Sequence, residues 1–476
     1  MPSNPNSATG AGGSFLSRWY QLWKQAIRGD TEDFTQGPIK TAVFLLSVPM
    51  VLEMALESVF AVTDIFFVAK LGADAVSAVG LTEAAITVLY AIAIGLSMGT
   101  TAMIARRVGE KRFDLASKVA GQALWIGLVT AAIVGLCGVL YAEQILRLMG
   151  ASDEVVAIGS GYTVWLMGGS LTITWLFIIN AIFRGAGDAG IAMRSLWLAN
   201  GINIVLDPLL IFGVGPFPEM GVAGAAVATT IGRGCGVGYQ LWMLFRVTER
   251  VRVKVSDLKL AMPIMARLMN VSAGGVGQFI IGTTSWIFLA RLIAVHGSAA
   301  IAGYTIGLRI IIFTIMPAWG LSNAAATLVG QNLGAGQPER AQRSAWMCVR
   351  FNVTFMLLIA ITFLAFAPSL VRIFTQDPAV TEYAVMCLHT LSYGYCFYGL
   401  GMVLMQSLNG AGDTRTPTVL NFFAFWAFQI PLAWWLSTRM QLGPLGVFMA
   451  VPIAEVLLAA GAVWAFRRGR WKTQVV

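Results

Sequence analysis

The chain has 476 residues, of which 57% are hydrophobic and only 12% are charged, with a formal net charge of +9 at pH 7. Soluble proteins carry about 25% charged residues, so the composition excludes an ordinary soluble domain and favours a helical membrane protein. The two histidines and five cysteines show no metal-ligand spacing, and no nucleophile motif is present. We therefore expect a protein that is not an enzyme and has no cofactor or metal site.

We expect residues 1–37 to form a cytoplasmic tail, and residues 1–14 are polar and lack the apolar core of a cleavable signal peptide. Within it, the stretch FLSRWYQLWKQAI places five apolar side chains on one helical stripe: Phe15, Trp19, Leu22, Trp23 and Ala26. This pattern indicates a helix lying on the inner membrane surface. The alternative is a frayed cytoplasmic tail.

Twelve apolar segments follow the tail, each long enough to cross a bilayer, for which about 20 residues suffice. The first six predicted helices cover residues 39–69, 76–105, 117–141, 155–183, 192–214 and 219–246. The second six cover residues 261–291, 300–330, 341–367, 379–408, 415–438 and 443–467. Pro49 lies inside the first helix and predicts a kink there.

The two halves of the sequence resemble one another when position 184 is aligned with position 409. The motif RGAGD at 184–188 then matches NGAGD at 409–413, and Gly109 matches Gly334. Because six spans are an even number, both halves enter the membrane from the same side. Transporters built from such parallel repeats bind substrate between the halves and move one half against the other.

These observations predict an all-α integral membrane protein with twelve transmembrane helices in two pseudo-symmetric six-helix lobes. The predicted parts are a cytoplasmic tail at 1–37, an N-lobe at 38–246, a cytoplasmic linker at 247–260, a C-lobe at 261–467 and a tail at 468–476.

Lysine and arginine concentrate at one end of the predicted helices, and Arg184 is assigned to that end. The opposite ends carry only Lys70, Arg147, Arg291, Arg372 and Arg439. Since the side richer in Lys and Arg stays in the cytoplasm, we expect both termini to be cytoplasmic and the protein to span the plasma (inner) membrane. The positive net charge then reflects topology, and we expect no nucleic-acid partner.

Three acids lie in the first predicted helix. A charged group at the bilayer centre costs roughly 2.5–3.5 kcal/mol on insertion scales, so such residues usually have a functional role. Glu57 lies about 40° and Asp64 about 20° from Glu53 around the helix axis. All three acids therefore share one face, which must meet a partner or a water-filled cavity. We take Glu53 and Glu57 as candidates for the wall of the substrate cleft.

Polar residues also interrupt the fifth predicted helix, where Asn203 and Asp207 lie one turn apart on one face. Asp64 and Asp207 lie at similar depths, near the outer ends of their helices. Two carboxylates in one low-dielectric pocket can take up and release a proton, or can bind Na⁺ with the Asn203 oxygen. The alternative is a hydrogen-bonded structural role. The C-lobe carries only one intramembrane acid, Glu455.

Two further charged pairs are predicted. In the alignment of the two halves, Glu83 matches Leu308, the neighbour of Arg309. Glu83 and Arg309 thus occupy nearly equivalent places and could form a latch across the outer cleft. Arg233 lies about level with Glu53 and Glu57, so we predict a structural ion pair between it and one of them.

The combined motifs resemble the multidrug and toxic compound extrusion (MATE) family over about residues 38–467. The similar stretches are VTDIFFVAKLG, AIFRGAGD, NIVLDPLLIFG, GVAGAAVAT and LNGAGDTRTP. The resemblance implies twelve helices in two lobes and the export of cationic, amphipathic compounds by antiport.

The resemblance also assigns residues. Asp64 matches the family's helix 1 aspartate, Asn203 and Asp207 match a pair in helix 5 of the DinF-like branch, and Thr229 falls where a helix 6 threonine joins that site. The branch implies coupling to H⁺, with Na⁺ as the alternative. The NorM-like branch has acids in helices 7 and 10, where this chain offers only Gln278, so we expect no C-lobe cation site of that type.

We therefore expect a monomeric antiporter for small amphipathic or cationic molecules, with Gln278, Trp286 and Trp319 as further cleft candidates. The alternative is a flippase for a lipid-linked precursor or polysaccharide on the same architecture. Such cargo is anionic and would need a cationic cavity, whereas the predicted spans hold six acids and two arginines.

Overall fold

The computed structural model describes residues 15–29, 33–248 and 250–474. Side chains are described except at 15–19, 28, 61, 62, 64 and 65, so the side chain of the predicted site residue Asp64 lies outside the described residues. All regular elements in the described part are helical. This confirms the all-α prediction.

The N-lobe helices are α2 (Ile39–Val68), α3 (Ala73–Gly109), α4 (Phe113–Leu140), α6 (Asp153–Gly168), α7 (Ser170–Ala186), α8 (Ala189–Phe212) and α9 (Val222–Trp242). Shorter elements are α1 (Phe15–Arg28), η1 (Ala69–Leu71), α5 (Ala142–Leu148), η2 (Met243–Val247) and η3 (Val255–Leu258). Pro49 lies inside α2, which continues through it as one helix.

The C-lobe helices are α10 (Met262–Ala294), α11 (Ser298–Gly334), α12 (Pro338–Arg372), α13 (Pro378–Ser392), α14 (Tyr395–Gly410) and α17 (Pro444–Arg468). Between α14 and α17 the chain forms α15 (Arg415–Asn421), η4 (Phe422–Gln429), α16 (Ile430–Trp434) and η5 (Trp435–Arg439), and η6 (Arg470–Thr473) follows α17. Both η4 and η5 are π-helical and continue one helical segment from Arg415 to Arg439.

In the described part of the chain, nine helical segments are each long and apolar enough to cross a membrane. The pair α6 and α7, bent by 41° at Gly169, makes a tenth. The remaining two of the twelve predicted spans correspond to α9 and to the pair α13 and α14. The observed helices therefore follow the twelve predicted spans in order.

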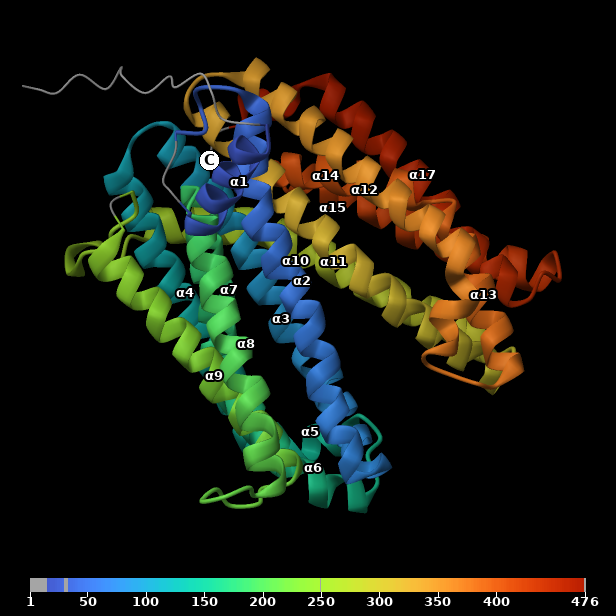
Figure 1. Cartoon of the computed structure of the whole chain (residues 1–476). Coiled ribbons are helices and arrows are strands. Elements are labelled where there is room, and N and C mark those ends of the chain that lie inside the picture. The colour runs from blue at the N-terminus through green and yellow to red at the C-terminus, as the bar shows by residue number, and fades with distance from the viewer. Residues whose placement is uncertain (1–14, 30–32, 249, 475–476) are drawn as a thin grey trace, which may run out of the picture.

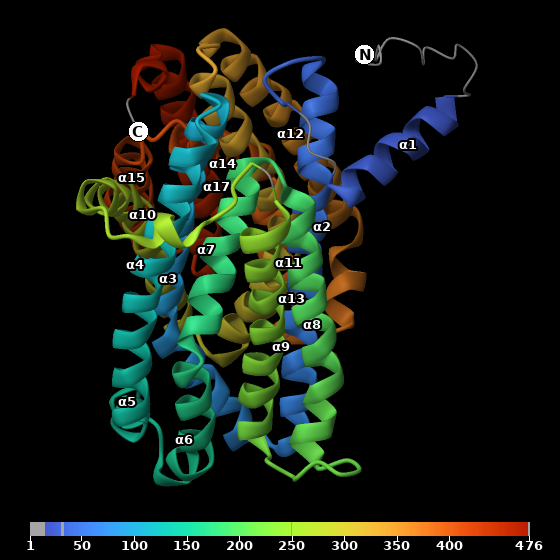
Figure 2. The same cartoon turned by 90° about the vertical axis from the view of Figure 1, so that its left-hand side faces the viewer.

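The two lobes form a V (Figure 1). They meet at the end where α1 and the start of α12 lie, and their helices diverge toward the end where α5 and α6 lie. A view turned by 90° shows the described C-terminal residues at the same end as the start of α2 (Figure 2). The first two helices of each lobe make most of the contact between lobes, with α2 against α11 and α3 against both α10 and α11.

A pair of glycines allows a close approach between the lobes. A Cβ added to Gly109, at the end of α3, would lie 2.0 Å from the backbone oxygen of Gln331 in α11. A Cβ added to Gly334, at the end of α11, would lie 2.2 Å from the backbone oxygen of Arg106 in α3. These are equivalent positions in the sequence repeat, so each lobe packs its glycine against the backbone of the other.

Polar contacts add to this closed end. Arg340 of α12 donates to the backbone oxygens of Gln36 (2.7 Å) and Gly37 (2.9 Å), just before α2. The Gln331 amide donates to the backbone oxygen of Gly185 at 2.9 Å. The first contact joins the C-lobe to the segment before α2, and the second joins it to α7 of the N-lobe.

The amino-terminal helix α1 packs against α2. Ala26 is buried, Leu22 packs against the same apolar core, and the Trp23 ring meets Phe44 edge to face at 5.8 Å. Tyr20 remains 69% exposed. Phe15 and Trp19, also predicted on the apolar stripe, have side chains outside the described residues. Binding of this helix to the membrane surface stays a prediction.

Candidate functional site

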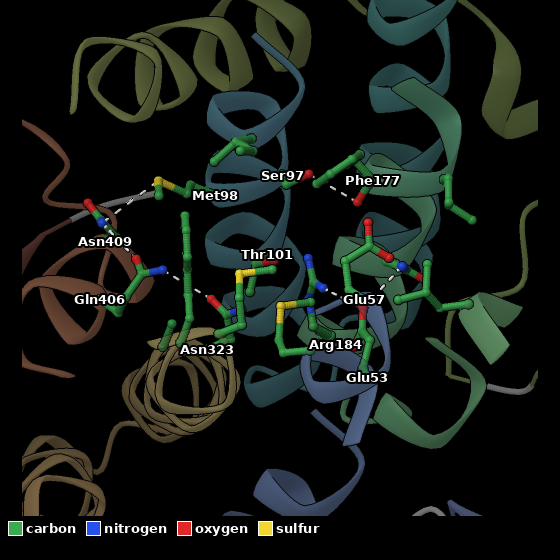
Figure 3. A pocket seen from close by; sticks show the side chains of 18 of the residues that line it. Glu53, Glu57, Ser97, Met98, Thr101, Phe177, Arg184, Asn323, Gln406 and Asn409 are labelled. Atoms are coloured by element: carbon green, nitrogen blue, oxygen red, sulfur yellow. Dashed lines mark hydrogen bonds and ion pairs between the residues drawn. The ribbon is translucent and has the colours of Figure 1, made fainter. Parts of the chain in front are cut away.

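A central cavity lies between the lobes and has two adjacent parts. The N-half, about 160 Å³, is lined by residues of α2, α3, α7, α8, α9, α11 and α14 (Figure 3). The C-half, about 260 Å³, is lined mainly by C-lobe residues. Met98, Trp319, Gln406 and Asn409 line both parts, so the two parts are adjacent.

The structure places all five predicted cleft residues on the wall of this cavity. Glu53, Glu57 and Trp319 line the N-half, and Gln278, Trp286 and again Trp319 line the C-half. The helix 1 acids Glu53 and Glu57 thus face a cavity, as their shared helix face required. Whether any of them contacts cargo stays a prediction.

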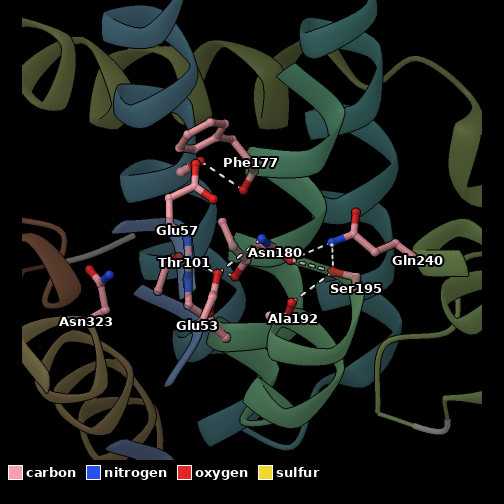
Figure 4. A network of polar contacts seen from close by, with 12 residues as sticks. Glu53, Glu57, Thr101, Phe177, Asn180, Ala192, Ser195, Gln240 and Asn323 are labelled. Atoms are coloured by element: carbon pink, nitrogen blue, oxygen red, sulfur yellow. Dashed lines mark hydrogen bonds and ion pairs between the residues drawn. The ribbon is translucent and has the colours of Figure 1, made fainter. Parts of the chain in front are cut away.

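In the N-half, Glu53 is held by an ion pair. Its Oε1 accepts from Arg184 Nη1 at 2.9 Å and from Asn180 Nδ2 at 3.1 Å, and the glutamate is 1% exposed. The Asn180 oxygen accepts in turn from Ser195 and Gln240 (Figure 4). The buried network therefore joins α2 to α7, α8 and α9.

The C-half contains the equivalent pair without charge. The internal repeat relates Glu53 to Gln278 and Arg184 to Asn409. Gln278 and Asn409 exchange two hydrogen bonds, each of 3.0 Å. In each lobe, this pair therefore joins the first helix to the end of the fourth span. The N-lobe pair, between α2 and α7, is ionic, and the C-lobe pair, between α10 and α14, consists of neutral amides.

Two predictions about arginines were wrong. The sequence assigns Arg184 to a cytoplasmic loop, but α7 continues to Ala186 and leaves Arg184 only 8% exposed against Glu53. Arg233 is predicted to pair with Glu53 or Glu57. It donates instead to the Tyr90 hydroxyl at 3.3 Å, and it forms no ion pair with any described residue. Arg184 occupies the position beside Glu53 that Arg233 was predicted to fill.

The charges of the two cavity halves differ. The N-half wall carries Glu53, Glu57, Arg184 and Arg233, which formally cancel. Glu455 is the only charged residue among the described side chains that line the C-half. The excess of acid over arginine expected from the sequence is therefore confined, within the cavity, to the C-half.

Three of the four predicted cation-site residues lie in α8 and α9. Asn203 Nδ2 donates to Thr229 Oγ1 at 2.9 Å, and Asp207 lies one turn further along α8. Asn203 and Asp207 are 2% and 0% exposed. The fourth residue, Asp64, belongs to α2, which packs against α8, but its side chain lies outside the described residues. None of Asn203, Asp207 and Thr229 lines the central cavity.

The predicted latch pair is not formed among the described residues of this structure. Glu83 of α3 and Arg309 of α11 are both exposed, and no ion pair between them is found in the part of the chain that the structure describes. Because the lobes diverge toward that end (Figure 1), the latch stays a prediction for a state in which those ends meet.

Two six-helix lobes around a central cavity define a membrane transporter of the two-lobe class. The MatE family model matches the chain twice, over residues 49–209 and 274–435. The two matches begin at positions 49 and 274, which the internal repeat also pairs. The chain belongs to the MATE family and is a multi-pass membrane transporter rather than an enzyme.

Several known proteins are similar along nearly their whole length. A probable multidrug resistance protein NorM of Thermotoga maritima is 27% identical, over 92% of this chain and 94% of that protein. A protein of Shewanella oneidensis named FAD transporter is 26% identical, over 92% and 97% respectively. A solved outward-facing multidrug resistance MATE family transporter superimposes with a TM-score of 0.87 at 25% identity, covering 94% of this chain and 99% of its own.

Proposed function

We propose that this chain is a secondary active antiporter of the plasma (inner) membrane. It exports small amphipathic, cationic compounds in exchange for H⁺, with Na⁺ as the alternative coupling ion. Family membership supports transport driven by an ion gradient, and a relative named for multidrug resistance supports a small-molecule cargo. The bias of Lys and Arg supports cytoplasmic termini, in which case the structure has its cavity open toward the outside.

The observation that carries the cationic assignment is the charge of the central cavity. Among the described side chains, no lysine lines it and its two arginines lie in the N-half with two glutamates. The C-half holds Glu455 with Trp286 and Tyr398. Aromatic faces and a carboxylate favour an organic cation. A flippase for an anionic lipid-linked precursor, or a carrier for the anionic cargo in the name of the Shewanella relative, would need an excess of cationic side chains.

The proposed coupling site is the group Asp64, Asn203, Asp207 and Thr229. Asp207 is fully buried between helices, where its charge is costly, so a proton bound there removes that cost. Loss of the charge would change how α2 packs on α8. Because α2 also contacts α11 of the other lobe, this change can be passed to the contact between lobes.

The purified protein in liposomes tests this proposal. We expect an imposed pH gradient to drive ethidium movement, and a Na⁺ gradient at equal pH to drive it if Na⁺ is the coupling ion. Asp207→Asn and Asp64→Asn should each abolish gradient-driven transport, whereas Asp74→Asn, at an exposed acid in the first turn of α3, should not. Full activity of both coupling-site variants would refute the coupling assignment, and absence of ethidium movement under either gradient would refute the cargo class.

A further inference from the structure

Glu455 is the one intramembrane acid of the C-lobe, and the proposed coupling site does not use it. It lies in α17, is 4% exposed, and lines the C-half of the central cavity. It also lines a smaller adjoining pocket together with Trp286 and Tyr398. Its side chain therefore borders a cavity while being almost entirely withdrawn from the surface.

No described residue supplies a counter-charge for this carboxylate. Glu455 has no hydrogen bond or ion pair in the described part of the chain, and no Lys or Arg lines the C-half. A buried ionised carboxylate without a counter-charge is costly, more so at membrane depth. The position thus requires a charge or a proton that the protein itself does not provide.

Several other polar groups of the C-half are engaged with one another. Gln278 and Asn409 bond mutually, and the Asn409 amide also donates to Gln406 at 2.9 Å. Ser285 donates to Gln429 at 3.1 Å. Glu455 is therefore the charged acceptor in this half that remains for a ligand.

The surroundings of Glu455 match one class of ligand. The indole of Trp286 and the phenol of Tyr398 line both pockets with it, and aromatic faces attract organic cations. A metal ion needs several ligating side chains, and the described residues contain no group of three or more metal-binding acids, histidines or cysteines. The chemistry fits a planar or bulky organic cation.

We propose that Glu455, with Trp286 and Tyr398, forms a subsite in the C-lobe that binds the positive charge of the transported organic cation. The proposal rests on the proposed function, and it locates the charge-recognising part of the cavity. In the N-half, Glu53 and Arg184 form an ion pair, and the charges of Glu57 and Arg233 formally cancel, so that half carries no net charge.

Binding of tetraphenylphosphonium to the purified full-length protein tests the subsite, with triphenylphosphine oxide as a neutral probe of related shape. We expect Glu455→Gln to weaken tetraphenylphosphonium binding at least tenfold and to change binding of the neutral probe less than twofold. Glu455→Asp keeps the charge and should retain the preference for the cation. The control is Glu382→Gln, which alters an exposed acid of the same lobe.

Unchanged tetraphenylphosphonium affinity in Glu455→Gln would overturn the subsite while leaving the proposed export function standing. Equal losses for both probes would also overturn it, because they would show a general collapse of the pocket. Normal binding of the cation combined with lost proton-driven exchange would instead make Glu455 a proton site. Failure of the parent protein to move any organic cation would reject the proposed function itself.

Discussion

Replacing Gly109 by alanine should push the lobes apart at the end where they meet. The added Cβ would lie 2.0 Å from the Gln331 oxygen and 2.7 Å from the Gln331 carbonyl carbon, both backbone atoms that cannot rotate away. Ordinary contact begins at 3.4 Å, so the two backbones must separate locally until the oxygen reaches that distance. The variant should therefore disfavour the closed arrangement of this end.

The size of the effect follows from the cost of overpacking, about 1–3 kcal/mol for an added methyl group in a tight contact. If that cost falls only on the closed arrangement, the ratio of closed to open molecules falls by about 5–150-fold. Alanine also favours helix over glycine by about 1 kcal/mol, but this preference is the same in both arrangements and cancels from their ratio.

Spin labels at Arg112 and Gln337, exposed residues on opposite lobes near this contact, would report the distance between lobes. The native cysteines would first be replaced in a background that still transports. We expect a new population at longer distance for Gly109→Ala. The matched control is Gly80→Ala in the same helix, where an added Cβ meets no atom within 4 Å. Identical distance distributions for both variants would refute the reasoning.

Three further outcomes are expected. Arg184→Gln leaves Glu53 buried without its counter-charge and should destabilise the protein by about 3–5 kcal/mol, whereas the double variant Glu53→Gln with Arg184→Asn, which copies the C-lobe pair, should recover most of the loss in thermal unfolding. Arg340→Ala removes the bonds to the chain before α2 and should speed amide hydrogen exchange near Gly37 without altering α17. Burial raises the pKa of Asp188, in the turn between α7 and α8, to about 6, so this carboxyl's stabilising contribution is complete below about pH 4 and is lost as pH rises through 6. Asp188→Asn should accordingly unfold at a higher temperature than the parent at pH 7 and at a similar temperature near pH 4.

Much of the architecture follows from sequence patterns that do not depend on the exact ends of the helices. Apolar segment lengths give the spans, and the repeat identifies Gly109 and Gly334 as equivalents, which both lie at the contact between lobes. The face shared by Glu53 and Glu57 depends only on helix geometry, and both residues do face the cavity. These predictions need only the period of a helix and the thickness of a bilayer.

The partners of these residues could not be predicted in the same way. Hydropathy ends the fourth predicted span at residue 183 and so puts Arg184 in a loop, although three more helical residues carry it into the protein. Helix ends predicted from sequence are uncertain by a few residues. Here that uncertainty hid Arg184 as the partner of Glu53. The position of Glu455 on the cavity wall could not be predicted either, because it depends on how α17 packs beside α10 and α14.

The ionic pair in one lobe and the amide pair in the other respond differently to separation. Separating Glu53 from Arg184 strands a buried charge and costs about 3–5 kcal/mol, whereas separating two neutral amides costs about 1–3 kcal/mol for each group left unsatisfied. The C-lobe amides also have other partners, since Gln278 donates to the Thr414 backbone oxygen and Asn409 donates to Gln406. As the transporter changes shape, the amide pair should therefore exchange hydrogen-bond partners more readily than the ion pair, beside the C-half that we propose binds the cation.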